Sequence, residues 1–292
     1  MTTRRASEVG GGLLRVPAQL PVRHLSISSL RCFARCPEEW RRKYVEKAPD
    51  QTGAAALAGR AYGSSIEAHF WAQMNGESFS AQDADDLLLC EFGAEVADAR
   101  AKKSLAGDED LDKVRENCRA PLRGYLRDVA PGVVEPKAVE REMRARFAGA
   151  EWDFVAYLDL DCAHTVIDEK LSGSNKWTQR YADGDLQVTS YLLMKQLLGE
   201  PCRNFEFHVA KPGKEEIKVL ETSRTPAQLE HLQRRIAMVA RQIARCVETG
   251  DWGYAEEGSW KCSAKWCSHF ASCPGGGALK GSGFENTNNK EA

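Results

Sequence analysis

The spacing of apolar side chains changes near the middle of the chain. Up to about residue 130, apolar residues recur at intervals of three and four, which is the period of helices that bury one face. This half predicts four helices, running from Ser28 to about Lys47, from about Ala54 to Met74, from Ser80 onward, and from about Leu111 to Val129. Ser80 and Asp83 form a capping box at the start of the third helix.

Beyond residue 137 the pattern alternates, which indicates strands. Three strands are predicted first, from Ala138 to Phe147, Trp152 to Leu160 and His164 to Glu169. A helix from about Tyr181 to Leu198, strands near Phe205 to Ala210 and Glu216 to Leu220, and a helix capped by Thr225 that ends near Thr249 complete the pattern. Together these elements predict an α/β (α+β) fold with a small central mixed sheet flanked by helices.

The two ends of the chain differ from this pattern. Residues 1–22 begin with a polar, Gly-rich stretch and residues 275–292 are rich in Gly and Asn, and we expect both segments to be disordered. The interval 23–274 is predicted to be a single domain. Its parts are a helical portion (about 26–130), a catalytic core (about 137–222), and a last helix with a cysteine-rich segment (about 225–274).

Composition narrows the class of protein. In 292 residues, hydrophobic content of 42% and charged content of 28% are ordinary for a globular protein. A formal net charge of −2 argues against a protein that coats nucleic acid, but not against a nuclease, whose metal-binding carboxylates offset its basic residues. No apolar run approaches about 18 residues, and no signal peptide is recognisable. We therefore expect a cytoplasmic protein without a membrane segment, in a prokaryotic or phage-infected cell.

The segment from Phe154 to Lys170 carries the candidate chemistry. Asp159 lies in an apolar strand, and Asp168 ends the next one. Because neighbouring strands are about 4.8 Å apart, the two carboxylates can face each other and hold Mg²⁺ or Mn²⁺. Lys170 shares a face with Asp168 and can stabilise a scissile phosphate, which is a phosphodiester-hydrolysis arrangement. The Glu169 side chain points to the opposite face, although its backbone carbonyl can reach the metal.

Taken alone, this short segment is more often an ordinary hairpin with solvent-facing Asp and Lys. The following helix adds Gln187 and Tyr191, four residues apart on one face, which can bond a nucleic-acid backbone or groups around the metal. The loop between the strand that carries Lys170 and this helix contains basic and aromatic residues suited to a DNA strand, namely Lys176, Trp177 and Arg180.

The order and spacing of these residues resemble one family. The series is Ser26-Ile-Ser-Ser-Leu30, Cys36-Pro37, Gly59, Glu67, Glu140, Asp159, Asp168-Glu-Lys170 and Gln187-x-x-x-Tyr191. It resembles the RecB-type nucleases of the PD-(D/E)xK superfamily over about residues 25–273. The resemblance implies a restriction-endonuclease-like core, metal on Asp159 and Asp168, and a catalytic Glu67. Where the family often has His between Gly59 and Glu67, this chain has Gly63, and His69 is about 200° round the helix from Glu67.

Cysteines form a second candidate site. Cys262, Cys267 and Cys273 lie within twelve residues, a spacing typical of a metal-ligand cluster. Cys36 is the expected fourth ligand, with Cys32 as its possible substitute. One early and three late cysteines resemble the iron–sulfur members of the family, which implies a [4Fe–4S] cluster; structural Zn²⁺ suits four thiolates equally.

The remaining residues near the cysteines also carry expectations. We expect aromatic side chains to pack around the cluster, with stacking on DNA as the alternative; these are Trp260, Trp266, His269 and Phe270. The other thiols are expected in the core, namely Cys90, Cys118, Cys162, Cys202 and Cys246.

The sequence thus favours a metal-dependent DNA exonuclease in recombination, repair, phage replication or CRISPR adaptation. No Walker A motif is present, so any helicase would be a separate partner, as would a recombinase or a CRISPR-adaptation integrase. Two alternatives stay open. One is a non-catalytic DNA-end-binding or adaptor subunit with a degenerate site, and the other is a structural protein held together by zinc.

Overall fold

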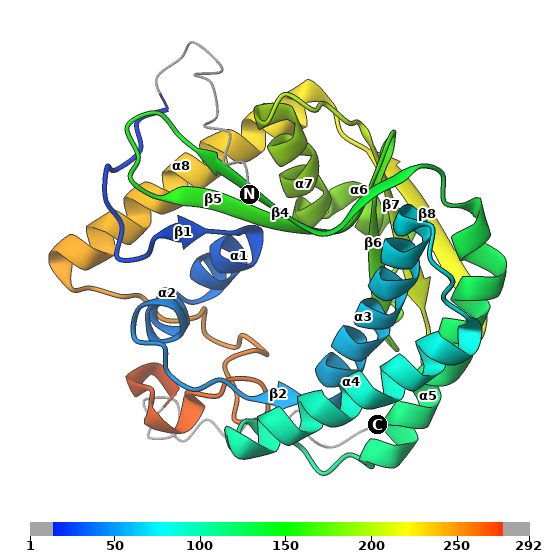
Figure 1. Cartoon of the computed structure of the whole chain (residues 1–292). Coiled ribbons are helices and arrows are strands. Elements are labelled where there is room, and N and C mark those ends of the chain that lie inside the picture. Colours follow the sequence, from blue (N-terminus) through cyan, green and yellow to red (C-terminus); the bar gives the residue numbers. More distant parts are fainter. Residues whose placement is uncertain (1–13, 277–292) are drawn as a thin grey trace.

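The computed structural model describes residues 14–276 (Figure 1). The elements of its first half are β1 (His24–Leu25), α1 (Ile27–Arg35), α2 (Pro37–Trp40), β2 (Thr52–Gly53), α3 (Ala54–Asn75), α4 (Ala81–Ala101), β3 (Leu105–Ala106) and α5 (Leu111–Gly124). The second half contains β4 (Pro136–Arg146), β5 (Asp153–Cys162), β6 (Thr165–Leu171), α6 (Gln179–Gly184), α7 (Leu186–Leu197), β7 (Asn204–Ala210), β8 (Ile217–Ser223) and α8 (Pro226–Thr249). Short π-helical turns follow α2 and α5 (Arg41–Val45 and Tyr125–Val129), and 3₁₀ turns cover Ala130–Gly132 and Phe270–Ser272.

The first predicted helix is not continuous. It begins slightly earlier than expected, with Ser26 rather than Ser28 as its cap, and α1 ends before Cys36. Cys36 is extended (φ −158°), because Pro37 disfavours a helical conformation for the residue before it. The same Cys36 then caps α2, its sulfur accepting the backbone N–H of Glu39 at 3.4 Å. A cysteine is thereby fixed at the corner between two helices.

Six strands form a mixed sheet in which the order β1-β5-β6-β7-β8 runs across the molecule and β4 lies along the other edge of β5. The pairs β4–β5, β5–β6 and β7–β8 are antiparallel, whereas β1–β5 and β6–β7 are parallel. The strands β2 and β3 form a separate parallel pair. The structure confirms the predicted α/β class with a central mixed sheet.

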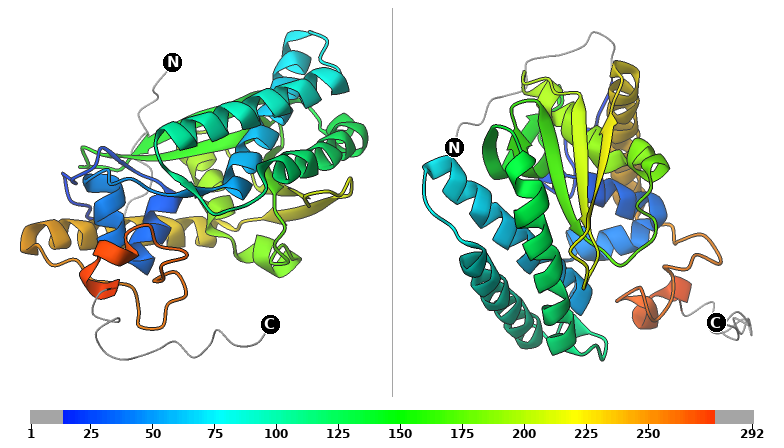
Figure 2. Two further views of the ribbon diagram at one scale, coloured as in Figure 1. Left: turned by 90° about the horizontal axis from the view of Figure 1, so that it is seen from below. Right: turned by 90° about the vertical axis from the view of Figure 1, so that its right-hand side faces the viewer.

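Helices cover both faces of this sheet (Figures 1 and 2). α3 contacts β4, β5 and β6, and α4 and α5 pack on α3. On the other face α7 contacts β4, β5 and β7, and α8 packs on α7 and α1. Each face has its own apolar core, which we call the α3-side core and the α7-side core. Within residues 14–276, no helix is long and apolar enough to cross a membrane.

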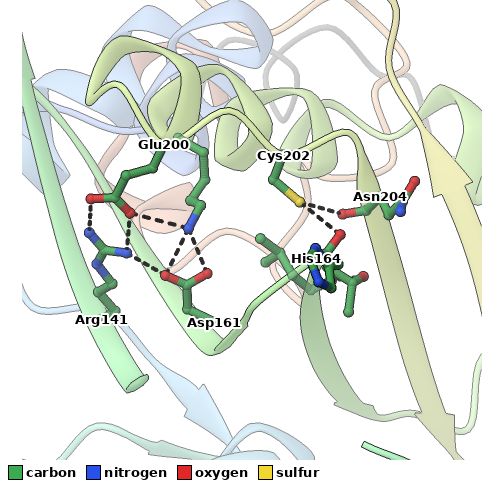
Figure 3. A network of polar contacts seen from close by, with 9 residues as sticks. Arg141, Asp161, His164, Glu200, Cys202 and Asn204 are labelled. Carbon is green, nitrogen blue, oxygen red and sulfur yellow. Dashed lines mark hydrogen bonds and ion pairs between the residues drawn. The ribbon is translucent and has the colours of Figure 1, made fainter. Parts of the chain in front are cut away.

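A buried ion network joins β4, β5 and the end of α7 (Figure 3). The Asp161 carboxylate is completely buried and accepts hydrogen bonds from Lys195 Nζ at 2.8 and 3.0 Å. Arg141 also pairs with Asp161 and makes a bidentate bond to Glu200 at 2.7 and 2.8 Å. Each charged group in the network has a partner, and this pairing offsets the cost of removing the charges from water. The network therefore fixes α7 against β4 and β5.

The chain ends depart in part from the prediction. Disorder was expected for residues 1–22, and this is wrong for residues 14–22, which pack on the domain. Pro17 O accepts a hydrogen bond from Trp152 Nε1 at 3.0 Å, and Ala18 O accepts one from Glu151 N at 2.7 Å. Val16 also packs against the α7-side core. Residues 1–13, and all but the first two residues of the tail 275–292, lie outside the described part.

Candidate active site

The hairpin of β5 and β6 separates into two arms at the candidate site (Figure 1). The strands pair over only two residues each, Leu160–Asp161 with Val166–Ile167. Asp159 and Asp168 follow next in this register, and we call this point of divergence the fork. Since the arms no longer pair there, the backbone N–H of Glu169 donates instead to Asp159 Oδ2 at 3.1 Å. The fork therefore holds two carboxylates side by side.

Lys170 lies on the same face of β6 as Asp168, as strand alternation predicts. Its Nζ is 3.6 Å from Asp159 Oδ2 and also pairs with Asp168 Oδ2. Asp168 is fully buried, and this burial, together with the charge of Asp159, raises the pKa of Asp168 well above its ordinary range. Burial lowers the pKa of Lys170, but the charges of Asp168 and Asp159 outweigh it and raise that pKa. Lys170 therefore stays cationic beside both aspartates.

An irregularity in the sheet brings Glu140 to the fork. Leu158 packs in the α7-side core and Leu160 in the α3-side core, although residues two apart normally share a face of a strand. The alternation is therefore interrupted at Asp159. Glu140 occupies the facing position on β4, with a left-handed φ of 43° that is rare outside glycine. Such irregularities redirect side chains next to active sites.

Helix α3 adds a fourth carboxyl group, Glu67. The pKa of Glu67 is raised to about 9 by burial, by a hydrogen bond with the Glu140 side chain, and by the charges of Glu140 and Asp159. Such a shift is typical of carboxyl groups that meet without enough positive charge to balance them. Within residues 14–276, no three His, Cys, Asp or Glu side chains already form a metal-ion site. The donor set nevertheless suits a hard divalent cation, which binds carboxylate oxygens.

Helix α7 begins at the fork because the helix predicted over residues 181–198 is two helices. Asp185 interrupts it and caps α7, its carboxylate accepting the backbone N–H of Gln187 at 2.6 Å. The buried Arg224 guanidinium donates to Asp185 O at 2.9 Å, and Arg31 pairs with the Asp185 carboxylate at 2.8 Å. These bonds fix the start of α7.

The pair Gln187 and Tyr191 reaches the buried aspartate from this helix. Gln187 Nε2 donates to Asp168 Oδ1 at 2.6 Å and to Tyr191 OH at 2.9 Å. Tyr191 is buried, and its ring packs on Phe205. Gln187 therefore orients Asp168, and Tyr191 in turn fixes Gln187. Because both side chains are held by these bonds, neither is free to lie along a DNA strand in this conformation.

The Glu169 carboxyl group lies on the opposite face of β6, beneath α5. It accepts a hydrogen bond from Tyr125 OH at 3.3 Å, and the same hydroxyl is 3.0 Å from His208 Nδ1. His208 Nε2 in turn bonds Glu206 at 3.0 Å. These hydrogen bonds fix β6 on the face opposite the fork, so that only the backbone of Glu169 faces the fork.

The three residues expected to bind DNA divide into two groups. Lys176 and Arg180 are exposed, as a phosphate contact requires. Trp177 is only 8% exposed and packs on Phe207 at a centroid distance of 5.2 Å. The loop thus folds the Trp177 ring into the core, and in this conformation the ring is not presented to a DNA strand; DNA binding by these three residues stays a prediction.

The four predicted cysteine ligands line one pocket, although within residues 14–276 their side chains are not arranged as a metal-ion site. One small pocket, which we call the thiol pocket, is lined by Cys36, Cys262, Cys267 and Cys273. Cys32 does not line it, and burial raises the pKa of Cys32 to about 12. Burial also raises the pKa of Cys36, although the backbone N–H that its Sγ accepts from Glu39 acts in the opposite direction and favours the thiolate form. Of the thiols expected in the core, Cys118 and Cys162 are buried and Cys202 and Cys246 half-buried, but Cys90 is exposed on α4.

The aromatic residues near the thiol pocket do not all behave as expected. His269 is buried, and Phe270 lines the pocket. Trp260 and Trp266, however, are 69% and 48% exposed. Packing around a cluster is thus the wrong expectation for these two indoles.

Sequence reasoning gave Glu140 no role, although it belonged to the motif series. Its place at the fork depends on the irregular backbone of β4 at this residue, which the sequence pattern does not reveal. At Gly63 the structure shows room for a side chain, since the nearest atom to a Cβ added there would be Glu67 Oε1 at 3.7 Å. The histidine that the family often has would therefore lie beside Glu67.

Comparisons with known proteins identify the family to which the chain belongs. Residues 24–274 match the sequence model of the PD-(D/E)XK nuclease superfamily. Among solved structures, a candidate exonuclease from Eubacterium rectale is similar with a TM-score of 0.54 at 17% identity, over 81% of this chain and 86% of that one. SSO0001 has a TM-score of 0.39 at 12% identity, covering 86% of each chain. The alkaline exonuclease LHK-Exo from Laribacter hongkongensis has a TM-score of 0.33 at 12% identity, over 75% and 94%. A comparison with curated proteins finds no significant match.

Proposed function

Because the chain belongs to the PD-(D/E)XK nuclease superfamily, we propose that it is a metal-dependent DNA exonuclease whose reaction centre is the fork. The observation that carries this proposal is the position of Lys170 between Asp159 and Asp168. Two carboxylates and an ammonium group at one point are the arrangement that phosphodiester hydrolysis requires.

Mg²⁺ or Mn²⁺ is the proposed cofactor. Asp159, Asp168 and the backbone carbonyl of Glu169 would hold the ion, with Glu67 and Glu140 supplying the remaining oxygen atoms. A bound divalent ion supplies Lewis-acid activation of the phosphate and of water. The raised pKa values of Asp168 and Glu67 support this proposal, because burial and, after it, the neighbouring carboxylates disfavour the charged forms, and a bound cation would favour them.

The protein's own groups have separate roles in the proposal. Lys170 remains charged and neutralises the negative charge that develops on the phosphate. Gln187 fixes the carboxylate of Asp168 by its 2.6 Å bond. Lys176 and Arg180, both exposed, contact the DNA backbone next to the fork.

The proposed substrate is DNA with free ends, cleaved in the cytoplasm. We favour an exonuclease over a site-specific endonuclease because no base-reading module is evident in the sequence. The absence of a Walker A motif leaves strand separation to a partner such as a helicase. A recombinase or a CRISPR-adaptation integrase would fit equally as the partner, which places the activity in recombination, repair, phage replication or adaptation.

We further propose that the thiol pocket binds a metal centre, a [4Fe–4S] cluster or alternatively structural Zn²⁺. Four thiols from two distant segments line this pocket, which supports the proposal. Bound metal would join α1 and α2 to the end of the chain and so contribute to folding. Anaerobic purification with iron, sulfide and zinc analysis distinguishes the two centres; a protein with neither metal would contradict the proposal.

A second function rests on Gly63. If the absent histidine has cost the site its metal, the chain is a DNA-end-binding or adaptor subunit without catalysis. That alternative predicts DNA binding with no degradation in Mg²⁺ or Mn²⁺.

The test of the exonuclease proposal uses three DNA forms with the wild-type protein. A linear duplex labelled at the 5′ end, the same duplex labelled at the 3′ end, and a covalently closed circle are incubated with Mn²⁺. We expect mononucleotide or short products from linear DNA, no cut in the circle, and no products in EDTA. Cleavage of the circle at the same rate as linear DNA would overturn the exonuclease assignment but would still show nuclease activity.

A further inference from the structure

Two neighbouring indole rings project from the loop between the last helix and the end of the described chain. Trp260 is 69% exposed and Trp266 is 48% exposed. Their ring centroids are 5.6 Å apart at an interplanar angle of 85°. Exposed rings of this size contribute little to a core, and exposed apolar groups that cluster mark binding sites.

The charged side chains between these rings are both positive. Lys261 and Lys265 follow Trp260 and precede Trp266, respectively. Lys265 Nζ lies 5.0 Å from the Trp266 ring centroid, and neither lysine forms an ion pair with a residue in the described part of the chain. The nearest acidic residues along the loop are Glu256 and Glu257, which precede the first indole. Lys265 is exposed, whereas Lys261 is half-buried and also lines the thiol pocket with Glu38 and Glu39. The positive charge next to the indoles is thus mainly that of Lys265.

The loop that carries the rings is fixed to the body of the protein by other residues. Ser268 Oγ donates to Asp50 Oδ1 at 2.6 Å, and the backbone of Gln51 donates to Ser268 Oγ at 3.0 Å. Farther along, Arg42 Nη1 donates to Ser272 Oγ at 2.9 Å. Because these bonds hold the loop, the tryptophans are not needed to attach it.

We propose that Trp260, Trp266, Lys261 and Lys265, which we call the tryptophan platform, bind single-stranded DNA. Bases stack on the two indoles and the phosphates contact the ammonium groups, a combination that tolerates any base sequence. This inference rests on the proposed function, since it assigns the class of DNA that the enzyme holds. A duplex buries its base faces and cannot use the platform, so the preferred substrate has a single-stranded end.

The test measures binding in EDTA, where no cleavage occurs, by fluorescence anisotropy of a labelled oligothymidylate. The double variant W260A/W266A should bind the oligonucleotide about 10- to 100-fold more weakly than the wild type. W71A is the matched control, because Trp71 is 49% exposed on α3, away from this loop, and its affinity should not change. Affinity for a blunt duplex should be the same for all three proteins.

Two further variants keep the proposal falsifiable if the alanine substitutions disturb the loop. W260F/W266F keeps two aromatic faces and should restore most of the affinity. K261Q/K265Q keeps both indoles and should reduce the slope of log affinity against log salt concentration by about one unit. Metal content of each variant, compared with the wild type, shows whether the thiol pocket is intact.

Three outcomes would overturn the platform. These are unchanged oligonucleotide affinity in W260A/W266A, an equal loss for blunt duplex, or an unchanged DNA affinity with a changed oligomeric state, which would make the rings a protein interface. Cleavage of the same oligonucleotide in Mn²⁺ is measured separately. Wild-type protein that binds through the platform but never cleaves would contradict the nuclease proposal and leave the platform standing.

Discussion

At the fork, four carboxyl groups lie close together, and Lys170 pairs with two of them, Asp159 and Asp168. Asp159 and Asp168 come from β5 and β6, Glu140 from the strained position on β4, and Glu67 from α3. Lys170 balances part of this charge. Burial, and after it the neighbouring carboxylates, raise the pKa values of Glu67 and Asp168. When no cation is bound, bringing these carboxyl groups together lowers the free energy of unfolding. Because protonation relieves this effect, the free energy of unfolding should depend on pH.

The first prediction concerns Glu67 in metal-free buffer. Its pKa is about 9 in the folded protein, against 4.5 ordinarily, so between these values the folded state binds more protons than the unfolded state. Stability should therefore fall as pH rises from about 4.5 to 9. Glu67→Gln should lose part of this slope and be the more stable protein at pH 8, measured by urea denaturation in EDTA. Parallel curves for the two proteins would contradict the pKa shift.

The second prediction concerns Gly63. Gly63→His should fold, because the nearest atom to a Cβ there is 3.7 Å away, and should gain roughly 0.5 kcal/mol from replacing a helical glycine. The imidazole would lie beside Glu67, so Mn²⁺ should bind more tightly, measured by titration calorimetry. Gly93→His, a glycine with open surroundings on α4, controls for helix propensity alone. An equal Mn²⁺ affinity in the two variants would show that position 63 does not reach the metal.

The sequence was sufficient for some of these residues and not for others. The alternation of apolar and polar positions placed Asp168 and Lys170 on one face, because β6 is regular. It could not place Glu140, since the pleat of the sheet is interrupted there. The burial of Trp177 could not be predicted either, because its neighbours in the sequence, Lys176 and Thr178, are the same whether the ring faces solvent or the core.

At the scale of elements, two predicted helices are each divided, and both divisions serve a site. Pro37 ends α1 and leaves Cys36 at the corner. Asp185 ends α6 and begins α7 with Gln187 near its start. The proline was a visible signal in the sequence. The second break depends on Arg224, a distant residue that bonds the carbonyl groups at the junction, and no local pattern reveals it.

The third prediction concerns the ion network that holds α7 (Figure 3). Asp161→Asn leaves Lys195 and Arg141 without their buried partner, and should lower the free energy of unfolding by about 3 kcal/mol. Asp98→Asn is the matched control, because Asp98 pairs with Lys102 on the exposed face of α4 and should cost less than about 1 kcal/mol. Urea denaturation measures both. Equal losses would mean that the network is no stronger than a surface pair.

At the scale of the whole molecule, a mixed sheet between two helical layers carries the fork, and a separate loop closes back on the first helices. The fold class and the superfamily were both predictable, and both are confirmed. The fold class was predictable because the apolar pattern changes clearly from a helical to an alternating period. The superfamily was predictable because many motif residues occur in the expected order along the chain. Packing of residues 14–22 was missed because the Gly-rich stretch before them dominated the reading of the whole N-terminal segment, although apolar side chains alternate from Leu14 to Val22.

The fourth prediction concerns the thiol pocket. If the four thiols hold a metal centre, Cys273→Ser should lose iron or zinc and should lower the free energy of unfolding by several kcal/mol, because the metal joins two ends of the fold. Cys90→Ser is the matched control, since Cys90 is exposed on α4 and lies outside the pocket. Metal analysis and thermal denaturation of anaerobic protein give the answer. Identical metal content in the two variants would exclude Cys273 as a ligand.

The most direct test of the central claim, that the fork is a nuclease centre, is the cleavage rate of Asp168→Asn in Mn²⁺ beside that of Asp183→Asn. Asp183 is an exposed carboxylate on α6 and receives the same substitution outside the fork. With an end-labelled linear DNA, Asp168→Asn should cleave at least about 100-fold more slowly than the wild type, and Asp183→Asn should match the wild type. Equal rates for wild type and Asp168→Asn, with both proteins folded, would contradict the claim.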